Sequence, residues 1–384
     1  MCEHLKDNGY SVTVITGKPN YPKGSYYKNY NFYNKRIEYK NGIRIYRCFL
    51  IPRGAGGKAK LFLNYISFAF FSSIRILFLR EKFDKIIVYQ LSPATVGFPG
   101  LIAKYKFTAP LYFYVQDLWP ESISDAGGLN NKYILNAVDL MMKIFYQNST
   151  EIWVQSVGFI DYLINKGVNI SKIKYIPNTV EKFYKPQDIS VKYSHKFPLG
   201  FNILFAGNIG IAQDFETIIK AAQILNSKKV PINWIIIGDG SEKKNIQNLI
   251  KKLNLTNRFY FLGSFPSEEM PYYFACADAL LVSLKKTNIF SLTIPSKLQS
   301  YLACRKPIIG NVDGVAYNII KESNCGVCSK SGNHKEFAII VEKIFNTSLE
   351  DQNNYSINSY NYFLNHFERN VVYKLIDESL INHN

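Results

Sequence analysis

Short apolar segments rich in β-branched residues alternate with longer segments of helical periodicity along almost the whole chain. This alternation is typical of parallel sheets whose strands are joined by helices. The predicted strands are 11–16, 42–48, 84–90, 110–116, 151–156 and 172–177 in the first half, and 201–207, 233–238, 258–263, 279–284 and 306–310 in the second. The pattern predicts an α/β protein of two Rossmann-like domains in series, with the ligand where carboxyl ends of strands face an interdomain cleft.

A polar, proline-containing stretch separates the two sets of strands and indicates a linker. We predict an N-terminal domain over residues 1–185, a linker over 186–200 and a C-terminal domain over 201–365. A last helix is expected over 366–384, and packing of this helix back on the N-terminal domain is one of its possible arrangements.

The chain begins with what reads as the end of a helix, followed directly by the strand 11–16. A doubly wound domain normally opens with a strand that precedes this helix and lies centrally in the sheet. Without that strand the sheet would have two unpaired inner edges. We therefore expect the first strand to be missing through a truncated start, with an atypical domain as the alternative.

Residues 58–82 form the longest apolar segment of the chain. Asn64 and Arg75 interrupt the 19 residues between Lys60 and Arg80, so the length is marginal for a membrane span. Three interpretations stay open: a helix buried against a sheet, a helix that also touches a membrane with its basic ends at the headgroups, and a spanning helix.

The formal net charge of +17 is concentrated in the first half of the chain. Residues 1–186 hold 25 Lys and Arg against 12 Asp and Glu, a difference of +13. A basic domain indicates an anionic partner such as a lipid surface or a phosphorylated substrate. No module that reads nucleic acid is recognisable, so a nucleic-acid partner is not expected.

The six cysteines are scattered, and only Cys325 and Cys328 are closely spaced. No second Cys-x-x-Cys or His pair completes a zinc site, so we interpret the pair as incidental and expect no metal. Scattered cysteines also fit a reducing compartment.

The segment IPSKLQSYLACRKPIIG, residues 294–310, predicts a short helix followed by a buried strand. Ser296 and Gln299 fit a capping box at the helix start. Three apolar residues then share one helical face: Leu298, Tyr301 and Leu302. The motif can be simple helix capping, or a cradle in which free amides and Lys297 meet an anion.

Three predicted strands of the second half end in glycine, at Gly207, Gly238 and Gly263. Glycine lets the backbone approach a phosphate closely. The ordered set of glycine turns, together with the helix at Ser296, predicts a nucleotide site in the second domain.

The motifs FAGNIG, IGDGS, FLGSFPSEEMPYYFACADALLVSL and PSKLQSYLACRKPII, in this order, resemble the nucleotide half of the family 4 glycosyltransferases. The segment IPNTVEKFY is similar to the interdomain signature of that family. VQDLWPES resembles a subgroup that acts in capsule, O-antigen and exopolysaccharide assembly, with the strongest resemblance to L-fucosamine transferases. The resemblance covers nearly the whole chain and implies the GT-B architecture of two facing Rossmann-like domains.

The resemblance implies metal-independent sugar transfer from a nucleotide donor with retention of anomeric configuration. The nucleotide would bind the second domain and the acceptor the first, with backbone amides and cations stabilising the leaving diphosphate. The implied donor-binding residues are Gly207, Asn208, Gly210, Gln213, Gly238, Asp239, Gly263, Ser264, Phe265, Ser296, Lys297 and Ser300.

The sequence departs from the family pattern at charged positions. Leu292 and Ser300 stand where many members carry two glutamates, and Asn208 and Gln213 stand where an Arg and a Lys are common. Lys297 is therefore expected to carry more of the charge compensation, and the residue that contacts the ribose stays open.

Three residues of the QDLWPES motif are candidates for the acceptor side. Asp117 and Glu121 are the carboxylates best suited to polarise an acceptor hydroxyl or to stabilise positive charge on the sugar. A helix cap or a loop salt bridge is the alternative for both. Trp119 would stack on a sugar ring or pack in the core.

These observations predict a cytoplasmic glycosyltransferase, peripherally associated with the inner membrane through its basic N-terminal domain. The expected donor is a UDP-sugar, an N-acetylated hexose such as N-acetyl-L-fucosamine, and the expected acceptor is linked to a polyprenyl diphosphate. A UDP-sugar epimerase and an inactive scaffold for a membrane or partner are the alternatives. A dehydrogenase is disfavoured because no GxGxxG follows an opening strand.

Overall fold

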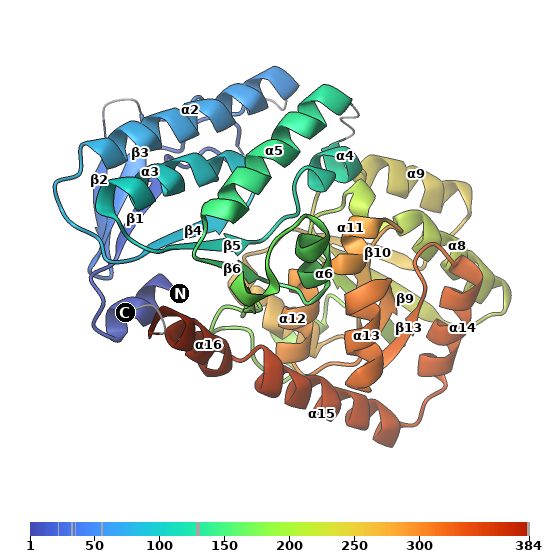
Figure 1. Cartoon of the computed structure of the whole chain (residues 1–384). Coiled ribbons are helices and arrows are strands. Elements are labelled where there is room, and N and C mark those ends of the chain that lie inside the picture. Colours follow the sequence, from blue (N-terminus) through green and yellow to red (C-terminus); the bar gives the residue numbers. More distant parts are fainter. Residues whose placement is uncertain (22, 32–33, 35, 55–56, 128–130, 382–384) are drawn as a thin grey trace. The chain divides into compact units, whose positions relative to one another are not determined.

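The structure is a computed structural model, and contacts within the chain divide it into two compact units (Figure 1). It describes all residues except 22, 32–33, 35, 55–56, 128–130 and 382–384. The first unit comprises Met1–Val154, Tyr162–Tyr175 and Ile376–Asn384, and the second comprises Gln155–Asp161 and Ile176–Leu375. The main boundary therefore falls after Tyr175, and residues 186–200 lie in the second unit.

The first unit alternates strands and helices, as the apolar pattern predicts. Its elements are α1 (Cys2–Asp7), β1 (Thr13–Gly17), β2 (Ile37–Lys40), β3 (Ile43–Cys48), α2 (Lys58–Leu77), β4 (Ile86–Gln90), α3 (Gly97–Phe107), β5 (Leu111–Val115), α4 (Glu121–Gly127), α5 (Lys132–Asn148), β6 (Glu151–Val154) and β7 (Ile173–Tyr175). Helix α6 (Gly158–Asn165) begins in the second unit and ends in the first.

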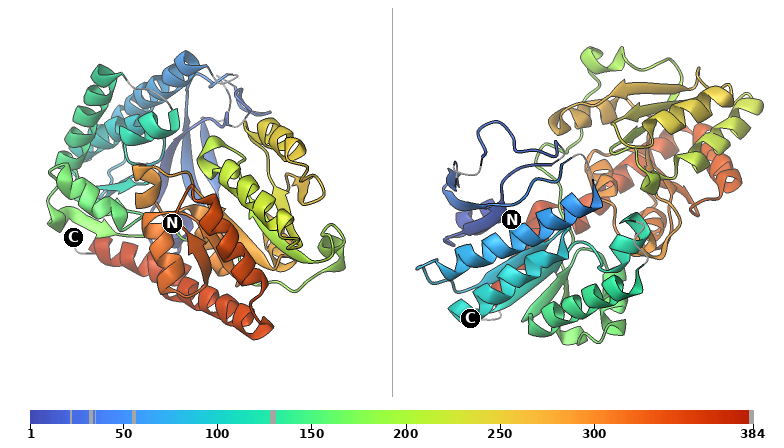
Figure 2. Two further views of the ribbon diagram at one scale, coloured as in Figure 1. Left: turned by 90° about the vertical axis from the view of Figure 1, so that its right-hand side faces the viewer. Right: turned by 90° about the horizontal axis from the view of Figure 1, so that it is seen from above.

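The strands of the first unit form two sheets. One has the order β1-β3-β2 and the other is the parallel sheet β4-β5-β6-β7. β1 is an edge strand of the first sheet, and β4 is an edge strand of the second. Strand β5 is buried along its whole length, and α2 and α3 lie side by side in the same unit (Figure 2).

Helix α16 (Arg369–Ile381) begins in the second unit and ends in the first. Lys85 Nζ donates to the carbonyl of Leu380 at 2.7 Å, and Trp153 Nε1 donates to Ser379 Oγ at 2.9 Å. A hydrogen bond of 2.9 Å joins His4 Nε2 to the carboxyl group of Asp377. The end of the chain is thus anchored on the first unit.

The second unit is built around a six-stranded parallel sheet of order β10-β9-β8-β11-β12-β13. Its strands are β8 (Phe201–Ala206), β9 (Ile232–Ile237), β10 (Phe259–Gly263), β11 (Ala279–Ser283), β12 (Ile308–Asn311) and β13 (Gly326–Ser329). Its helices are α7 (Val191–Ser194), α8 (Phe215–Ser227), α9 (Lys243–Lys252), α10 (Met270–Ala275), α11 (Asn288–Leu292), α12 (Ser296–Ala303), α13 (Gly314–Glu322), α14 (His334–Phe345) and α15 (Leu349–His366).

Two hydrophobic cores lie in this unit, and the residues of β8 alternate between them. Leu204 belongs to one core, whereas Ile203 and Phe205 belong to the other. This alternation is the period of two that a strand imposes on a sheet covered on both faces.

Every one of the eleven predicted strands overlaps a strand of the structure, but β2 and β13 were missed. β2 pairs antiparallel with β3 across Asn41-Gly42, both of which have positive φ. An Asn-Gly pair between strand-like segments is a hairpin signal, so β2 was detectable. β13 is four residues long and begins with Gly326, between the free cysteines Cys325 and Cys328.

Candidate active site

Three glycines hold the carboxyl ends of β8, β9 and β10 together. The amide of Gly207 donates to the carbonyl of Ile237 at 2.9 Å, and that of Gly238 donates to the carbonyl of Gly263 at 2.8 Å. A Cβ added to Gly238 would lie 1.9 Å from the carbonyl oxygen of Gly207. Only glycine fits this approach, and φ is +139° at Gly238 and +141° at Gly207.

Helix α12 begins at Ser296, as the sequence predicts, but the predicted capping box is wrong. Pro295 is the N-cap, and no side chain caps the helix start. Gln299 does not reach back to that start, because its Nε2 donates to the carbonyl of Asn178 at 2.6 Å. The predicted apolar face is confirmed: Leu298, Tyr301 and Leu302 are fully buried. Because the first amides of a helix lack intrahelical partners, this start can bind an anion.

Lys297 extends from this helix start toward the turn after β8. Its Nζ lies 3.9 Å from the centroid of the Phe205 ring and 3.5 Å from where a Cβ on Gly207 would stand. The Nζ donates a hydrogen bond to Gln213 Oε1. None of the ion pairs found in the described part of the chain includes Lys297.

Burial lowers the pKa of Lys297 from 10.5 to about 7. Desolvation disfavours the charged form of an amine, and here a ring and an amide oxygen replace water without supplying a negative charge. A phosphate group beside the Nζ would supply that charge. The arrangement is therefore suited to bind an anion at the turn after β8.

The other predicted donor residues lie around the same strand ends. Asn208 follows Gly207, and its Nδ2 lies 2.8 Å from where a Cβ on Gly210 would stand. Ser300 donates back to the carbonyls of Ser296 and Lys297, both at 3.2 Å. Asp239 accepts from the amide of Gly240 at 2.9 Å.

Gly263 and Phe265 flank Ser264 after β10. Ser264 is exposed, and the ring of Phe265 stacks on Tyr273 at 4.6 Å. The predicted donor residues thus come together at the ends of β8, β9, β10 and the start of α12, while their roles stay predictions.

Asp117 follows β5 in the first unit and accepts a hydrogen bond from Ser92 Oγ at 3.3 Å. Burial raises the pKa of this carboxyl, and the hydrogen bond from Ser92 opposes the rise only in part. A partly buried carboxyl whose pKa is raised is a better proton acceptor than an exposed one, which suits a general base.

Two buried polar atoms near Asp117 have no hydrogen-bond partner among the described residues. They are Nε1 of Trp119, which is 7% exposed, and Oε1 of Gln90, the fully buried last residue of β4. Buried polar groups without partners require an explanation, and a ligand hydroxyl is one. Core packing of Trp119 is thus observed, and no described residue accepts a hydrogen bond from its indole N–H.

Arg53 is a functional candidate that the sequence analysis missed. Its guanidinium carbon lies 5.2 Å from the centroid of the Tyr21 ring and 5.7 Å from that of Tyr65. Its Nε is buried without a partner, and Arg53 takes part in no ion pair of the described residues.

Arg53 and Asp117 belong to the same neighbourhood, because both charges act on the pKa of the Tyr65 hydroxyl. The Tyr65 ring in turn lies 6.4 Å from that of Trp119. Nothing in the sequence around Arg53 marks it, since the loop and α2 bring it to this place only in the fold.

Glu121, the second predicted carboxylate, belongs to a different network. It accepts from the Tyr162 hydroxyl and forms an ion pair of 3.0 Å with Lys166, which also pairs with Asp139 at 2.5 Å. These contacts agree with the salt-bridge alternative, and the catalytic role of Glu121 stays a prediction.

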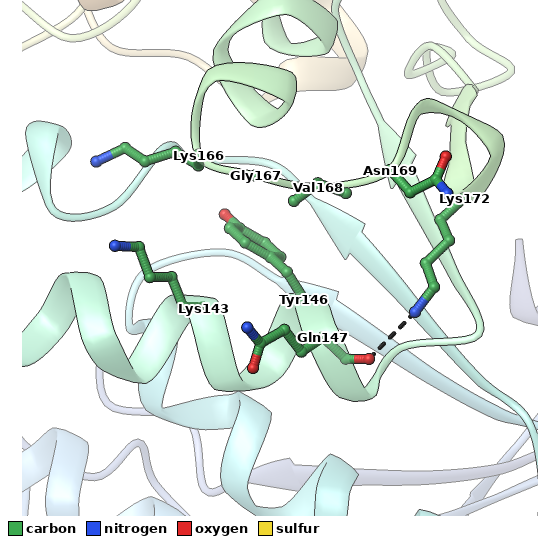
Figure 3. Close-up of a pocket in the computed structure, with 8 residues that line it drawn as sticks. All are labelled: Lys143, Tyr146, Gln147, Lys166, Gly167, Val168, Asn169 and Lys172. Carbon is green, nitrogen blue, oxygen red and sulfur yellow. Dashed lines mark hydrogen bonds between the residues drawn. The ribbon is translucent and has the colours of Figure 1, made fainter.

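A lysine-rich pocket lies beside this network (Figure 3). Its lining residues are Lys143, Tyr146, Gln147, Lys166, Gly167, Val168, Asn169 and Lys172. Lys143 and Lys166 both pair with Asp139, and Lys172 donates to the carbonyl of Gln147 at 3.1 Å. The pocket contains none of the predicted site residues, and its lysines already have partners.

Comparison with known proteins identifies the class of this two-unit protein. Residues 169–362 match the family described as glycosyl transferases group 1, and residues 1–179 match the glycosyl transferase 4-like domain. The chain belongs to the glycosyl transferases of group 1.

Two curated relatives cover most of the chain. The putative colanic acid biosynthesis glycosyl transferase WcaI of Escherichia coli is 27% identical over 79% of this chain and 75% of its own length. The probable glycosyltransferase WbjE of Pseudomonas aeruginosa is 25% identical over 79% of this chain and 76% of its own length.

Solved structures confirm the predicted GT-B fold. HepE of Anabaena, solved in complex with UDP, has a TM-score of 0.68 and 16% identity, covering 88% of this chain and 86% of its own. Sucrose-phosphate synthase of Thermosynechococcus elongatus has a TM-score of 0.76 and 15% identity, covering 99% of this chain and 90% of its own.

Proposed function

We propose that this glycosyltransferase moves a sugar from a UDP-sugar to a saccharide carried on a polyprenyl diphosphate, with retention and without a required metal, in surface polysaccharide biosynthesis. The sugar is an N-acetylated hexose such as N-acetyl-L-fucosamine. Support for the pathway comes from WcaI, a relative named for colanic acid biosynthesis, and support for the donor comes from HepE, whose structure contains UDP.

The surroundings of Lys297 carry the donor half of this proposal. An ammonium above the Phe205 ring, beside a glycine turn and a helix start, has amides and positive charge but no carboxylate partner among the described residues. The diphosphate of UDP complements such a site, because charge on the departing group would be met by groups already in place. Neither the uracil nor the ribose contact is assigned.

The neighbourhood of Arg53 and Asp117 supports the acceptor half. Arg53 offers planar donors that suit a phosphate, and Asp117 is placed to polarise a sugar hydroxyl. The basic charge of residues 1–186 favours an anionic lipid carrier, so we place the enzyme in the cytoplasm, peripherally on the inner membrane.

The test is a panel of UDP-sugars offered to the full chain with and without lipid-linked saccharides extracted from membranes. Transfer that requires both substrates, with the anomeric configuration retained in the product, is the expected result. Formation of an epimer from the donor alone would replace the proposal with epimerisation. If the protein binds UDP but turns over no donor, the protein is an inactive scaffold.

A further inference from the structure

Helix α2 of the first unit exposes several large apolar residues on its outer side. The outer stripe, as we call it, consists of five exposed residues whose spacing places them on one side of the helix: Phe62, Leu63, Ile66, Phe70 and Leu77. Phe62 is 64% exposed and Phe70 is 58% exposed. Phe78, directly after the helix, is 78% exposed.

The opposite face of α2 is buried, and it includes three polar residues, Asn64, Ser67 and Ser72, beside Ala69 and Ile76. Asn64 Nδ2 donates to the carbonyl of Ile51 at 2.6 Å, and Ser67 Oγ accepts from the amide of Ile51 at 2.9 Å. Ser72 is fully buried and donates to the carbonyl of Phe68. A surface helix normally shows the reverse arrangement, with its apolar stripe toward the core. The outer stripe therefore calls for an apolar contact outside the unit.

The length and composition of α2 also fit a membrane contact. Among the described residues, Ala59–Leu77 is the one helical segment long and apolar enough to cross a membrane, and 22% of that window is buried. Its inner face is fixed to the protein by the hydrogen bonds of Asn64 and Ser67. The helix is thus a preformed ridge for the surface of a bilayer rather than a span.

Basic residues stand at both ends of the outer stripe. Lys60 lies in the first turn of α2, and Arg80 and Lys82 follow its end; all three are exposed and form no ion pair within the described chain. Lys106, from the neighbouring α3, donates to the carbonyls of Ile76, Leu77 and Leu79 and adds positive charge there. Apolar side chains flanked by cations complement acyl chains beneath anionic headgroups.

We propose that the outer stripe of α2 docks on the surface of an anionic lipid bilayer. A second copy of the chain fits less well. An antiparallel pair of α2 helices would place Lys60 against Arg80, and a parallel pair would place Lys60 against Lys60, so both arrangements bring like charges together. A bilayer supplies negative charge for Lys60, Arg80 and Lys82, while Glu81 between the last two already pairs with Arg44.

Helix α2 also contributes Tyr65, whose ring contacts Arg53 on the side of the acceptor candidates. Docking by the outer stripe would bring Arg53 and Asp117 near the headgroup layer, where the diphosphate of a lipid carrier lies. This link to the acceptor rests on the proposed function, whereas bilayer binding by itself does not.

Vesicle binding of the full chain, without donor or acceptor, tests the inference. We expect binding to vesicles of phosphatidylcholine with phosphatidylglycerol, and little binding to phosphatidylcholine alone. The double variant Ile66→Ser with Phe70→Ser should bind at least about tenfold more weakly, because two apolar side chains no longer enter the bilayer. The matched control is Ile339→Ser on α14, where Ile339 is also exposed, and it should bind as the wild type does.

Two further measurements separate the competing outcomes. The tryptophan fluorescence of the Phe70→Trp variant should shift to the blue when anionic vesicles are added. The three native tryptophans are buried and give a constant background. If the double variant and the wild type bind equally well, charge alone explains vesicle binding and the proposal is overturned. A wild-type dimer that the double variant abolishes would assign the stripe to a second copy. UDP titration of the same proteins reports on the proposed function independently of the vesicles.

Discussion

The Nζ of Lys297 lies 3.9 Å from the centroid of the Phe205 ring, and its hydrogen bond goes to the neutral amide of Gln213. A ring face and an amide oxygen orient an ammonium without neutralising it. The lysine is therefore held in place with its charge available for a ligand. Electrostatic stabilisation of a leaving group depends on such preorganised charge.

Lys297→Ala should weaken UDP binding by about 1–3 kcal/mol, the range for a hydrogen bond to a charged group. Titration calorimetry with UDP measures the change. Lys330→Ala is the matched control, because Lys330 also lies over a ring, with its Nζ 3.7 Å from the centroid of Tyr317, but belongs to none of the predicted contacts. Equal loss in both variants would show that Lys297 has no special part in binding.

UDP affinity should fall as the pH rises from about 7 to 9. Burial lowers the pKa of Lys297 to about 7, so the free protein loses this proton over that range. A bound diphosphate favours the ammonium, so binding above the pKa must take up a proton and weakens by at most about tenfold per pH unit. Calorimetry in buffers of different ionisation enthalpy detects the uptake.

Lys297→Arg supplies the control for this pH dependence. A guanidinium stays charged throughout the range, so UDP affinity of the variant should be nearly independent of pH. If the wild type binds UDP equally well at pH 7 and pH 9 and takes up no proton, the pKa of Lys297 is not lowered in the free protein.

Periodicity of apolar residues was sufficient to predict both parallel sheets. Residues 111–115 and 234–237 are continuously apolar, which is characteristic of strands covered on both faces, and they lie in β5 and β9. The apolar face of helix α12 was predicted correctly, but the capping of the helix was not. Gln299 binds the carbonyl of Asn178, far along the chain, and no local pattern encodes that contact.

The glycine turns and the start of α12 were predictable because short local motifs build them, whereas their role in donor binding stays a prediction. Glycine turns and a helix start keep their geometry wherever the strand ends meet. Arg53 was not predictable, since its place between Tyr21 and Tyr65 depends on a loop that packs against α2. Likewise, the exposure of Phe70 could not be read from composition, because an apolar helix is normally expected to face the core.

Asp117→Asn should lower the rate of sugar transfer by about 10²–10⁴-fold while UDP affinity stays unchanged. This range is typical for removal of a general acid or base. Transfer assays under saturating donor, together with UDP calorimetry, separate the two quantities. Transfer that persists at the wild-type rate would remove Asp117 from the chemistry.

Glu121→Gln should act mainly on stability, in contrast to the change at Asp117. The carboxylate of Glu121 holds the Tyr162 hydroxyl and the ammonium of Lys166, so the variant should lose about 1–3 kcal/mol in the free energy of unfolding. Urea unfolding measures this loss. A large drop in the transfer rate of the folded variant, with normal stability, would restore Glu121 as a catalytic carboxylate.

Gly238→Ala should destabilise the second unit by roughly 3 kcal/mol or more. The new Cβ would meet the carbonyl oxygen of Gly207 at 1.9 Å, and the positive φ adds backbone strain. Gly332→Ala is the control, because Gly332 has φ +79° with open space around it and should lose only about 1–2 kcal/mol. Thermal or urea unfolding compares the two, and similar losses would show that the contact with Gly207 relaxes freely.

Arg53→Gln should weaken the binding of a short-chain polyprenyl diphosphate by about 1–3 kcal/mol, since a charged, planar donor set is replaced by a neutral amide. The titration is done on protein saturated with UDP, so that the diphosphate cannot occupy the site at Lys297. A polyprenyl alcohol, which has no phosphate, should bind wild type and variant equally.

Arg75→Gln is the matched control for Arg53, because Arg75 also lies over a tyrosine ring of the first unit, at 5.3 Å from the centroid of Tyr46. The two arginines differ in that the neighbourhood of Arg53 also contains the partly buried Asp117 and the unpartnered indole N–H of Trp119. Diphosphate binding should therefore depend on Arg53 and not on Arg75. If the two variants lose equal affinity, the effect reflects the net charge of the unit, and Arg53 has no acceptor role.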